Sequence, residues 1–216
     1  MATNREIFDG IARSWYGFRH HSRFQKELTE LALRWNGGRL LNIGCGHGAD
    51  FIPFKDNFEL FGLDFSTGMI TLARGYARKF SFQSDLVVAD AVNLPFKSGS
   101  FDWAIGVAVY HHIRGSQERQ KAFRELRRVL KPGSEAFITV WNKWQPGFWF
   151  RAKDTYVPWR TKEITFNRYY HLFSYGELER AITRSGFKVL NFSTGKSYRF
   201  KTKYFSRNLT VLIKAV

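Results

Sequence analysis

A glycine-rich turn constrains the fold of this chain more than any other feature of its sequence. Residues 41–49 read Leu-Asn-Ile-Gly-Cys-Gly-His-Gly-Ala and follow a short apolar run. Glycines at a strand-to-helix turn let a ligand approach the backbone, and the helix that follows offers unpaired N–H groups to an anionic group. Asp64 ends the next apolar run, 20 residues after Gly44, where a carboxylate can accept hydrogen bonds from both hydroxyls of a ribose. The turn and the acid together predict a ligand-binding crevice.

The order of apolar and helical segments predicts an α/β fold. Near-continuous apolar strands that alternate with helices indicate a parallel sheet covered on both faces. Ser174 and Glu177 have the spacing of a capping box for a last helix that ends near Gly186. We therefore predict a doubly wound, mostly parallel, seven-stranded sheet with an antiparallel C-terminal strand. The expected strands are 39–43, 59–64, 86–90, 101–109, 135–141, 187–193 and 208–216, and the other expected helices lie before residue 35, at 66–79 and at 116–130.

No internal repeat and no linker rich in proline, glycine or serine divides the chain, so we expect a single domain. The segment 142–173 differs from the rest because it holds ten aromatic residues in 32 positions. We expect it to form a structured insertion on the substrate side. The other parts are an N-terminal helical cap at 1–36, a cofactor-binding core at 38–141, and a C-terminal helix and strand pair at 174–216.

The charge of the chain is concentrated toward its C-terminus. The whole sequence carries a formal charge of +16, and residues 143–216 alone hold 15 basic and 4 acidic side chains. This asymmetry favours a polyanionic partner over a merely solvated surface. The single cysteine, Cys45, excludes an intramolecular disulfide, and the N-terminal residues lack the layout of a signal peptide. No apolar run approaches the ~20 residues of a membrane span, so we expect a soluble, cytoplasmic protein.

Two cofactors fit the glycine turn. Gly44, Gly46 and Ala49 satisfy the relaxed dinucleotide fingerprint, whereas Gly44, Gly46 and Gly48 satisfy the version found with S-adenosylmethionine. The third strand favours the second, because Asp90 follows it at a position where a carboxylate can accept a hydrogen bond from an adenine amino group.

At this point the sequence resembles the class I S-adenosylmethionine-dependent methyltransferases, with their Rossmann-like fold. Residues 43–48 resemble the first motif of that family, 62–64 the second, 90–91 the adenine-side motif and 101–105 the fourth strand. Asn42 departs from the pattern, since the family more often has an acid there. Cys45 is then a small turn residue rather than a nucleophile. The resemblance implies cofactor binding by Gly44, Cys45, Gly46, Gly48, Asp64, Phe65, Met69, Asp90, Ala91 and Ala108.

Several classes of methyl acceptor are disfavoured by what the sequence lacks. The fourth strand is followed by Tyr110-His111-His112 and not by the Asn/Asp-Pro-Pro-aromatic segment of enzymes that act on amino or amide nitrogens. Cytosine C5 enzymes need a cysteine beyond this strand, and Cys45 lies before it. No two of the six histidines are spaced as an i, i+4 pair of the zinc type, so we predict no metal site.

Three further segments, at 108–112, 154–159 and 167–179, resemble the tRNA wobble-uridine carboxymethyl methyltransferases, and the N-terminal segment from Phe8 to His20 does so as well. That family esterifies carboxymethyluridine in the anticodon loop. A carboxylate acceptor is already ionised at neutral pH, so the protein has to orient and desolvate it and needs no general base. The expected carboxylate-orienting residues are Arg19, Arg168 and one of His111 or His171, and the expected base-stacking residues are Trp159, Tyr169 and Tyr170.

Two partners follow from this resemblance. Residues 196–207 interleave basic and aromatic side chains, and we expect Lys201 and Lys203 to contact tRNA phosphates, although a solvated β-hairpin explains the same pattern. The family also works with a small zinc-binding activator subunit that adds a strand to the sheet. Its expected docking site is the apolar third strand near Leu86–Ala89, unless a helix or loop of the chain covers that edge.

Two other functions remain open from the sequence. A small-molecule methyltransferase of quinone type shares the first four motifs, but the basic C-terminal third argues against it. A non-catalytic RNA- or protein-binding module of the same fold is disfavoured by the intact Gly44, Gly46, Asp64 and Asp90.

Overall fold

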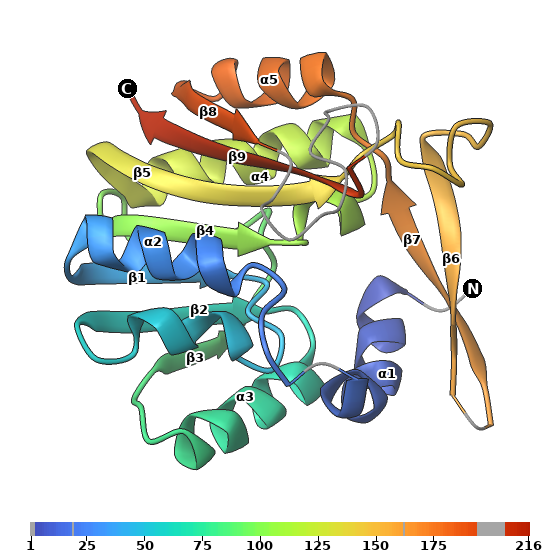
Figure 1. The fold of residues 1–216 in the computed structure, drawn as a ribbon, viewed down its shortest axis with the longest axis horizontal. Coiled ribbons are helices and arrows are strands. Elements are labelled where there is room, and N and C mark those ends of the chain that lie inside the picture. Colours follow the sequence, from blue (N-terminus) through green and yellow to red (C-terminus); the bar gives the residue numbers. More distant parts are fainter. Residues whose placement is uncertain (1–2, 19, 162, 194–205) are drawn as a thin grey trace.

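The central element of the fold is a seven-stranded sheet (Figure 1). The computed structural model describes residues 3–18, 20–161, 163–193 and 206–216. The strand order is β3-β2-β1-β4-β5-β9-β8, and β9 runs antiparallel to both of its neighbours, as the sequence predicts. The strands are β1 (Gly38–Ile43), β2 (Phe58–Asp64), β3 (Asp85–Val88), β4 (Phe101–Val107), β5 (Leu130–Trp141), β8 (Phe187–Ser193) and β9 (Asn208–Ala215).

Helices cover both faces of the sheet, because successive residues of the buried strands point to opposite sides. Leu40 of β1 packs with α2 (Gln25–Trp35) and α3 (Thr67–Lys79), whereas Leu41 packs with α4 (Ser116–Val129) and α5 (Tyr175–Thr183). Ile105 and Ala104 of β4 divide between the two faces in the same way. The near-continuous apolar strands of the sequence are thus buried on both sides.

The helix expected directly after the glycine turn is a short 3-10 helix, η1 (Ala49–Phe54). Only nine residues separate Gly48 from the start of β2 at Phe58, and Pro53 lacks the N–H that an α-helix would need there. Phe51 and Phe54 are fully buried under the sheet. The segment therefore seals the core, and the turn gains little from a helix dipole behind it.

The aromatic insertion at 142–173 contains a β-hairpin, which its sequence pattern does not reveal. Strands β6 (Asp154–Arg160) and β7 (Thr165–His171) pair antiparallel as a separate two-stranded sheet. Together with the first helix, α1 (Asn4–Phe18), the hairpin lies beyond the carboxyl ends of β1, β2 and β4, at the right of Figure 1. The Phe166 ring packs so closely on Gly10 that a Cβ on Gly10 would lie 2.6 Å from its Cζ.

Several element ends differ from the sequence-based expectation, most of all the fifth strand, which begins at Leu130 rather than near residue 135. The fourth strand ends at Val107, and a 3-10 turn, η2 (Tyr110–His112), follows it. The last helix begins at Tyr175 as predicted, but the Ser174 side chain makes no capping hydrogen bond. Glu177, its expected capping-box partner, instead binds His171 and Lys153. The predicted cap at Ser66 is present, since its Oγ accepts a hydrogen bond from Met69 N–H at 3.1 Å.

The two edges of the sheet are formed by β3 and β8. The prediction that the third strand lies at an edge is therefore confirmed, and the strand is only four residues long. In the part of the chain that the structure describes, no helix has both the length and the apolar character to cross a membrane.

Candidate active site

A cavity of about 680 Å³ opens at the carboxyl ends of the strands. Its wall combines the glycine turn with residues of α1, of the β6–β7 hairpin and of the start of β9. The carboxyl edge of an open α/β sheet is where such folds bind ligands. The cavity thus lies where the sequence motifs place it.

The glycine turn shapes one end of the cavity. Gly44 has a φ of 64°, and a Cβ on it would lie 2.3 Å from the Val109 Cγ2 atom. Gly46 also has a positive φ, of 54°, but a Cβ there would meet no atom within 4 Å. Gly44 is therefore required by packing, whereas Gly46 leaves its backbone open to a ligand.

Asp64 lies beside this turn as a buried hydrogen-bond acceptor. Its Oδ2 accepts from Gly46 N–H at 3.0 Å and its Oδ1 from Ser66 N–H at 2.9 Å. Burial raises the pKa of the carboxyl to about 6, and these two hydrogen bonds oppose the rise. A carboxylate has about four acceptor positions, so the ionised group keeps capacity to accept a further hydrogen bond from a ligand.

Nine of the ten predicted cofactor residues line the cavity: Gly44, Cys45, Gly46, Asp64, Phe65, Met69, Asp90, Ala91 and Ala108. Gly48 does not. With a φ of 91°, it faces α3, and a Cβ on it would lie 3.7 Å from that of Ala73. The third glycine therefore serves the packing of the turn rather than the ligand. Burial raises the pKa of the Cys45 thiol, in agreement with a turn residue that is not a nucleophile.

A second part of the cavity wall, the aromatic end, is formed by packed rings. The Tyr170 ring lies 5.0 Å from that of His111, nearly parallel to it, and 4.1 Å from that of Trp141. His111 Nδ1 accepts a hydrogen bond from Trp141 N–H at 3.2 Å. The neutral ring then carries its proton on Nε2, which makes that atom a donor. His112 also lines the cavity, and burial lowers its pKa to about 3.

Arg168 brings a positive charge into this aromatic end. The residue is 6% exposed, and its Cζ lies 4.8 Å from the Trp159 ring centroid and 5.3 Å from that of Tyr170. Burial lowers its pKa, although a guanidinium stays charged. Among the residues described, no carboxylate forms an ion pair with Arg168, and its Nε has no hydrogen-bond partner. An unneutralised buried cation is costly, which indicates that an anionic ligand belongs here.

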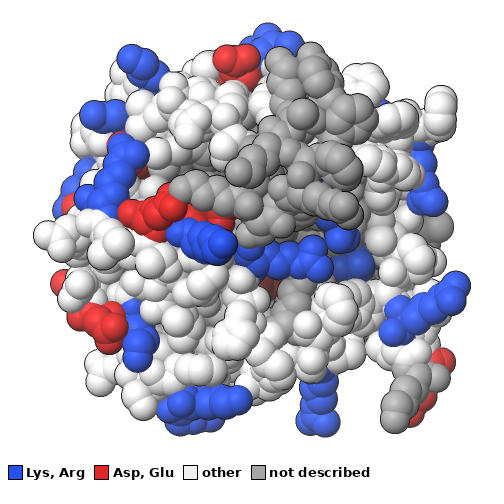
Figure 2. Space-filling view, viewed as in Figure 1, with Lys and Arg blue, Asp and Glu red and all other residues white. Residues whose placement is uncertain are grey.

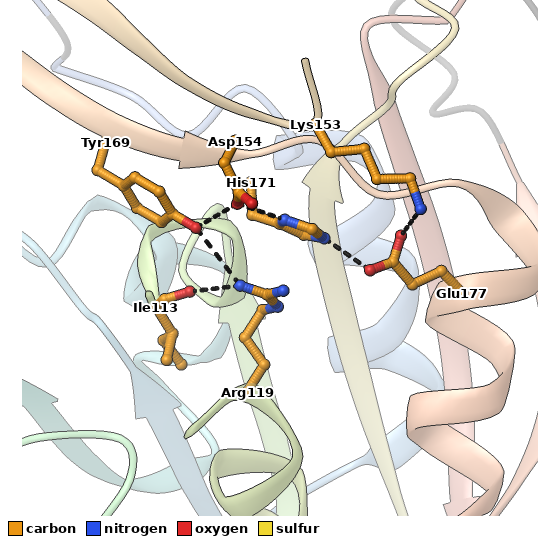
Figure 3. A network of polar contacts seen from close by, with 7 residues as sticks. All are labelled: Ile113, Arg119, Lys153, Asp154, Tyr169, His171 and Glu177. Carbon is orange, nitrogen blue, oxygen red and sulfur yellow. Dashed lines mark hydrogen bonds and ion pairs between the residues drawn. The ribbon is translucent and has the colours of Figure 1, made fainter. Parts of the chain in front are cut away.

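Alternate residues of β7 serve the two sides of that strand. Arg168 and Tyr170 line the cavity, whereas Tyr169 and His171 do not, so the structure does not bring these two predicted residues to the site. His171 Nδ1 contacts Asp154 Oδ1 at 2.8 Å, and its Nε2 contacts Glu177 Oε1 at 2.7 Å (Figure 3).

Around His171, a network of polar contacts fastens the hairpin to two helices (Figure 3). The Tyr169 hydroxyl donates a hydrogen bond to Asp154 and accepts one from the guanidinium of Arg119, on α4, at 3.5 Å. The Lys153 ammonium donates to the carboxylate of Glu177, on α5, at 2.9 Å. The network therefore holds β7 by the face that points away from the cavity.

Sequence reasoning also missed residues that shape the site. Asp9 of α1 accepts hydrogen bonds from Ser66 Oγ at 2.6 Å and from Gly68 N–H at 2.9 Å, so it caps α3 from another helix. No local spacing signals this contact. Trp15, Trp141 and Arg207 line the cavity as well. Of the predicted residues, Arg19, Lys201 and Lys203 lie outside the described residues. Over the described ranges, no group of three metal-binding side chains comes together.

Known proteins match the chain over most of its length. Residues 41–138 match the family described as a methyltransferase domain. A protein of Encephalitozoon cuniculi, named as a methyltransferase, is 33% identical over 169 residues, which cover 74% of the chain and 75% of that protein. A Schizosaccharomyces pombe protein named tRNA (carboxymethyluridine(34)-5-O)-methyltransferase is 28% identical over 86% of the chain and 88% of its own length. An Arabidopsis thaliana protein of the same name is longer, and the chain covers 35% of it at 32% identity.

Solved structures share the fold. The CcbJ methyltransferase of Streptomyces caelestis superimposes with a TM-score of 0.78 at 15% identity, over 100% of this chain and 98% of that one. A methyltransferase of Haloferax volcanii, solved in complex with the Trm112 methyltransferase activator, gives a TM-score of 0.72 at 18% identity, over 99% and 97% of the two chains.

Proposed function

The chain belongs to the class I S-adenosylmethionine-dependent methyltransferases, and we propose that it esterifies the carboxylate of 5-carboxymethyluridine at the wobble position of a tRNA anticodon. It is an enzyme, and its cofactor is S-adenosylmethionine. The proposal concerns the methyl acceptor, and the observation that supports it is the buried guanidinium of Arg168, which no carboxylate of the described residues neutralises.

The glycine-turn end of the cavity fits the cofactor. Gly46 leaves its backbone open, and Asp64 has remaining acceptor capacity for ribose hydroxyls. Asp90, exposed at the end of the third strand, is suited to the adenine amino group. When bound, S-adenosylmethionine supplies an electrophilic methyl group on a sulfonium. The residues of the turn have only to hold it in a fixed direction relative to the acceptor.

The aromatic end fits a uracil base with a carboxylate. Tyr170 and Trp159 are flat surfaces on which an unpaired base can stack, as RNA-binding proteins commonly do. Arg168 and the Nε2–H of His111 are donors for the carboxylate. Because an ionised carboxylate needs no general base, the chain's contribution is to orient it and to exclude water around it.

The name of the S. pombe relative and the charge of the chain support tRNA as the substrate. Residues 143–216 carry 15 basic and 4 acidic side chains, and Lys and Arg side chains are spread over the face seen in Figure 2, where a row of them crosses the middle. Such a surface attracts the phosphates of a nucleic acid. A cytoplasmic location is part of this proposal.

A small zinc-binding activator subunit is the second proposed partner. The H. volcanii methyltransferase of the same fold is solved with an activator. Among the described residues, the edge strand β3 pairs only with β2 in the sheet, and Val88 is 37% exposed. We propose that the activator docks on this edge, near Leu86–Ala89, by adding a strand.

The test is incubation of the chain with methyl-labelled cofactor and bulk tRNA, with and without the activator, followed by nucleoside analysis. We expect label in a wobble uridine, lost on mild alkaline hydrolysis because an ester is cleaved by base. The Arg168→Gln variant should lose this transfer and keep cofactor binding. Label in small molecules alone would favour the alternative, a quinone-type methyltransferase. Label that resists base would exclude carboxylate esterification.

A further inference from the structure

A second guanidinium lines the aromatic end of the cavity. Arg207 precedes β9, and its Cζ lies 4.8 Å from the ring centroid of Trp141. Its backbone carbonyl accepts a hydrogen bond from Asn142 N–H at 3.0 Å, which ties the start of β9 to the end of β5. Stacking on a buried tryptophan and a paired backbone hold this side chain at the cavity wall rather than in bulk solvent.

Arg207 is no better neutralised than Arg168. Within the ranges that the structure covers, no carboxylate makes an ion pair with either guanidinium. The two are close enough for Arg207 to add, after burial, to the lowering of the Arg168 pKa. Two like charges that share one cavity repel each other and lose hydration. A ligand with two negative groups relieves both costs.

The rings between the two arginines set the geometry of such a ligand. Arg168 lies over Tyr170 and Arg207 lies over Trp141, and the two rings are 4.1 Å apart. Each of these two rings therefore has one guanidinium beside it. A nucleotide has the same layout, with a planar base between an anionic substituent and a phosphate.

We propose that Arg168 and Arg207 form a two-anion site, in which Arg168 binds the carboxylate on the base and Arg207 binds the phosphate of the same nucleotide. The assignment of the carboxylate rests on the proposed function, whereas the phosphate site at Arg207 stands on its own geometry. Guanidinium groups suit phosphate because they donate two parallel hydrogen bonds. The site therefore selects a nucleotide over a free nucleoside and over a small acid with a single charge.

Calorimetry on the S-adenosylhomocysteine-bound protein tests this site with four probes: uridine, uridine 3′-monophosphate, 5-carboxymethyluridine and 5-carboxymethyluridine 3′-monophosphate. We expect each phosphate to improve affinity about tenfold or more, as charge-assisted hydrogen bonds do. Arg207→Gln should abolish that gain and leave the affinity for uncharged uridine unchanged. Arg207→Lys should keep part of it, because the charge remains while the two parallel hydrogen bonds are lost.

Arg184→Gln is the matched control, since Arg184 is exposed and does not line the cavity. The phosphate site is overturned if the wild-type protein binds phosphate-bearing and phosphate-free probes equally, or if Arg184→Gln removes the gain as Arg207→Gln does. Failure of the proposed function gives a different pattern. In that case uridine 3′-monophosphate still requires Arg207, but the carboxymethyl group adds no affinity and tRNA receives no ester.

Discussion

At the scale of single residues, the site depends on ionisable groups placed where water is scarce. Asp64 and Arg168 line the same cavity, and both are buried. Burial raises the pKa of Asp64 and lowers that of Arg168, because it disfavours the charged form of each group. Asp64 retains two backbone donors as partners, whereas Arg168 lacks an anion among the residues described. Asp64 can thus accept hydrogen bonds from hydroxyl groups, and Arg168 can bind an anionic group of a ligand.

Cofactor affinity should depend on pH through Asp64. Its pKa in the folded chain is about 6, so below that pH the carboxyl is protonated and loses acceptor capacity for ribose hydroxyls. We expect the Kd for S-adenosylhomocysteine to be constant above pH 7 and to rise up to about tenfold per pH unit below 6. The affinity of Asp64→Asn should be weak and independent of pH. Calorimetry from pH 5 to 8 measures this, and a constant wild-type Kd would contradict it.

Lowering the pH should weaken cofactor binding through Asp64 but should stabilise the folded chain through the same group. The pKa of Asp64 in the folded chain lies above the ordinary aspartate value of 3.8, so between these two values the folded state binds more protons than the unfolded state. The ligand-free wild-type chain should therefore gain stability relative to Asp64→Asn as the pH falls from about 6 to 4. Urea unfolding of both proteins at these pH values measures the difference, and a loss of relative stability toward pH 4 would contradict the assignment.

Replacing Arg168 should separate stability from activity. A buried ion pair that loses one partner typically costs 3–5 kcal/mol, but Arg168 has no carboxylate partner among the residues described, and its own desolvation is costly. We expect Arg168→Met to keep the free energy of unfolding within about 1 kcal/mol of wild type, or to raise it. Methyl transfer should fall at least about a hundredfold. Urea unfolding and single-turnover kinetics measure the two effects. A large loss of stability would assign Arg168 to the fold instead.

At the scale of elements, β7 joins the substrate end of the cavity to the rest of the molecule. One face of the strand presents Arg168 and Tyr170, and the other presents Tyr169 and His171 to the network of Figure 3. The pKa of Glu177 is lowered to about 2 because its hydrogen bonds to His171 and Lys153 outweigh burial. The ionised form is therefore the one that holds β7 in place.

Glu177→Gln should weaken substrate binding without touching the cavity. We expect a loss of about 1–3 kcal/mol in the free energy of unfolding at pH 7, since charge-assisted hydrogen bonds are lost. The loss should shrink as the pH falls from about 4.5 toward 2, where the wild-type carboxyl is protonated too. The KM for tRNA should rise while cofactor affinity stays constant. Glu179→Gln, exposed on the same helix, is the control. Equal effects of the two substitutions would argue against the network.

Local sequence patterns predicted elements well where a segment's own periodicity decides its structure. The strands of the sheet and the Ser66 cap are examples. The capping box at Ser174 failed because Glu177 is drawn to His171 and Lys153, which no local pattern reveals. The hairpin was missed because aromatic residues occupy both faces of β7. Without a strand assignment, the alternation that separates Arg168 from Tyr169 could not be applied.

At the scale of the whole molecule, the cavity is shared between two structural parts. The sheet supplies the glycine turn and Asp64, whereas α1 and the hairpin supply Trp15, Trp159 and Arg168. These parts join through tertiary contacts such as the Trp159 indole N–H to Ser14 Oγ, at 2.9 Å. The sequence motifs identified the cofactor end because they are local. They could not arrange the substrate end, because its members come from distant segments.

Asp9 should link stability to cofactor binding across these parts. We expect Asp9→Ala to lower the free energy of unfolding by about 1 kcal/mol, because the N-terminus of α3 loses a cap. The same change frees α1 from α3, so the Kd for S-adenosylhomocysteine should rise. Urea unfolding and calorimetry measure the two effects. Asp56→Ala, an exposed acid before β2, is the control. Unchanged cofactor affinity in Asp9→Ala would show that α1 keeps its place without this contact.

The two edges of the sheet allow the activator proposal to be tested within one molecule. Val88 on β3 and Leu190 on β8 are similarly exposed, at 37% and 39%. A lysine on an edge strand opposes the addition of another strand. We expect Val88→Lys to abolish copurification with the activator and the activator-dependent rate, with unchanged cofactor affinity, and Leu190→Lys to leave both intact. The reverse result would place the activator on β8. Full activity of the chain alone, as a monomer, would remove the need for an activator altogether.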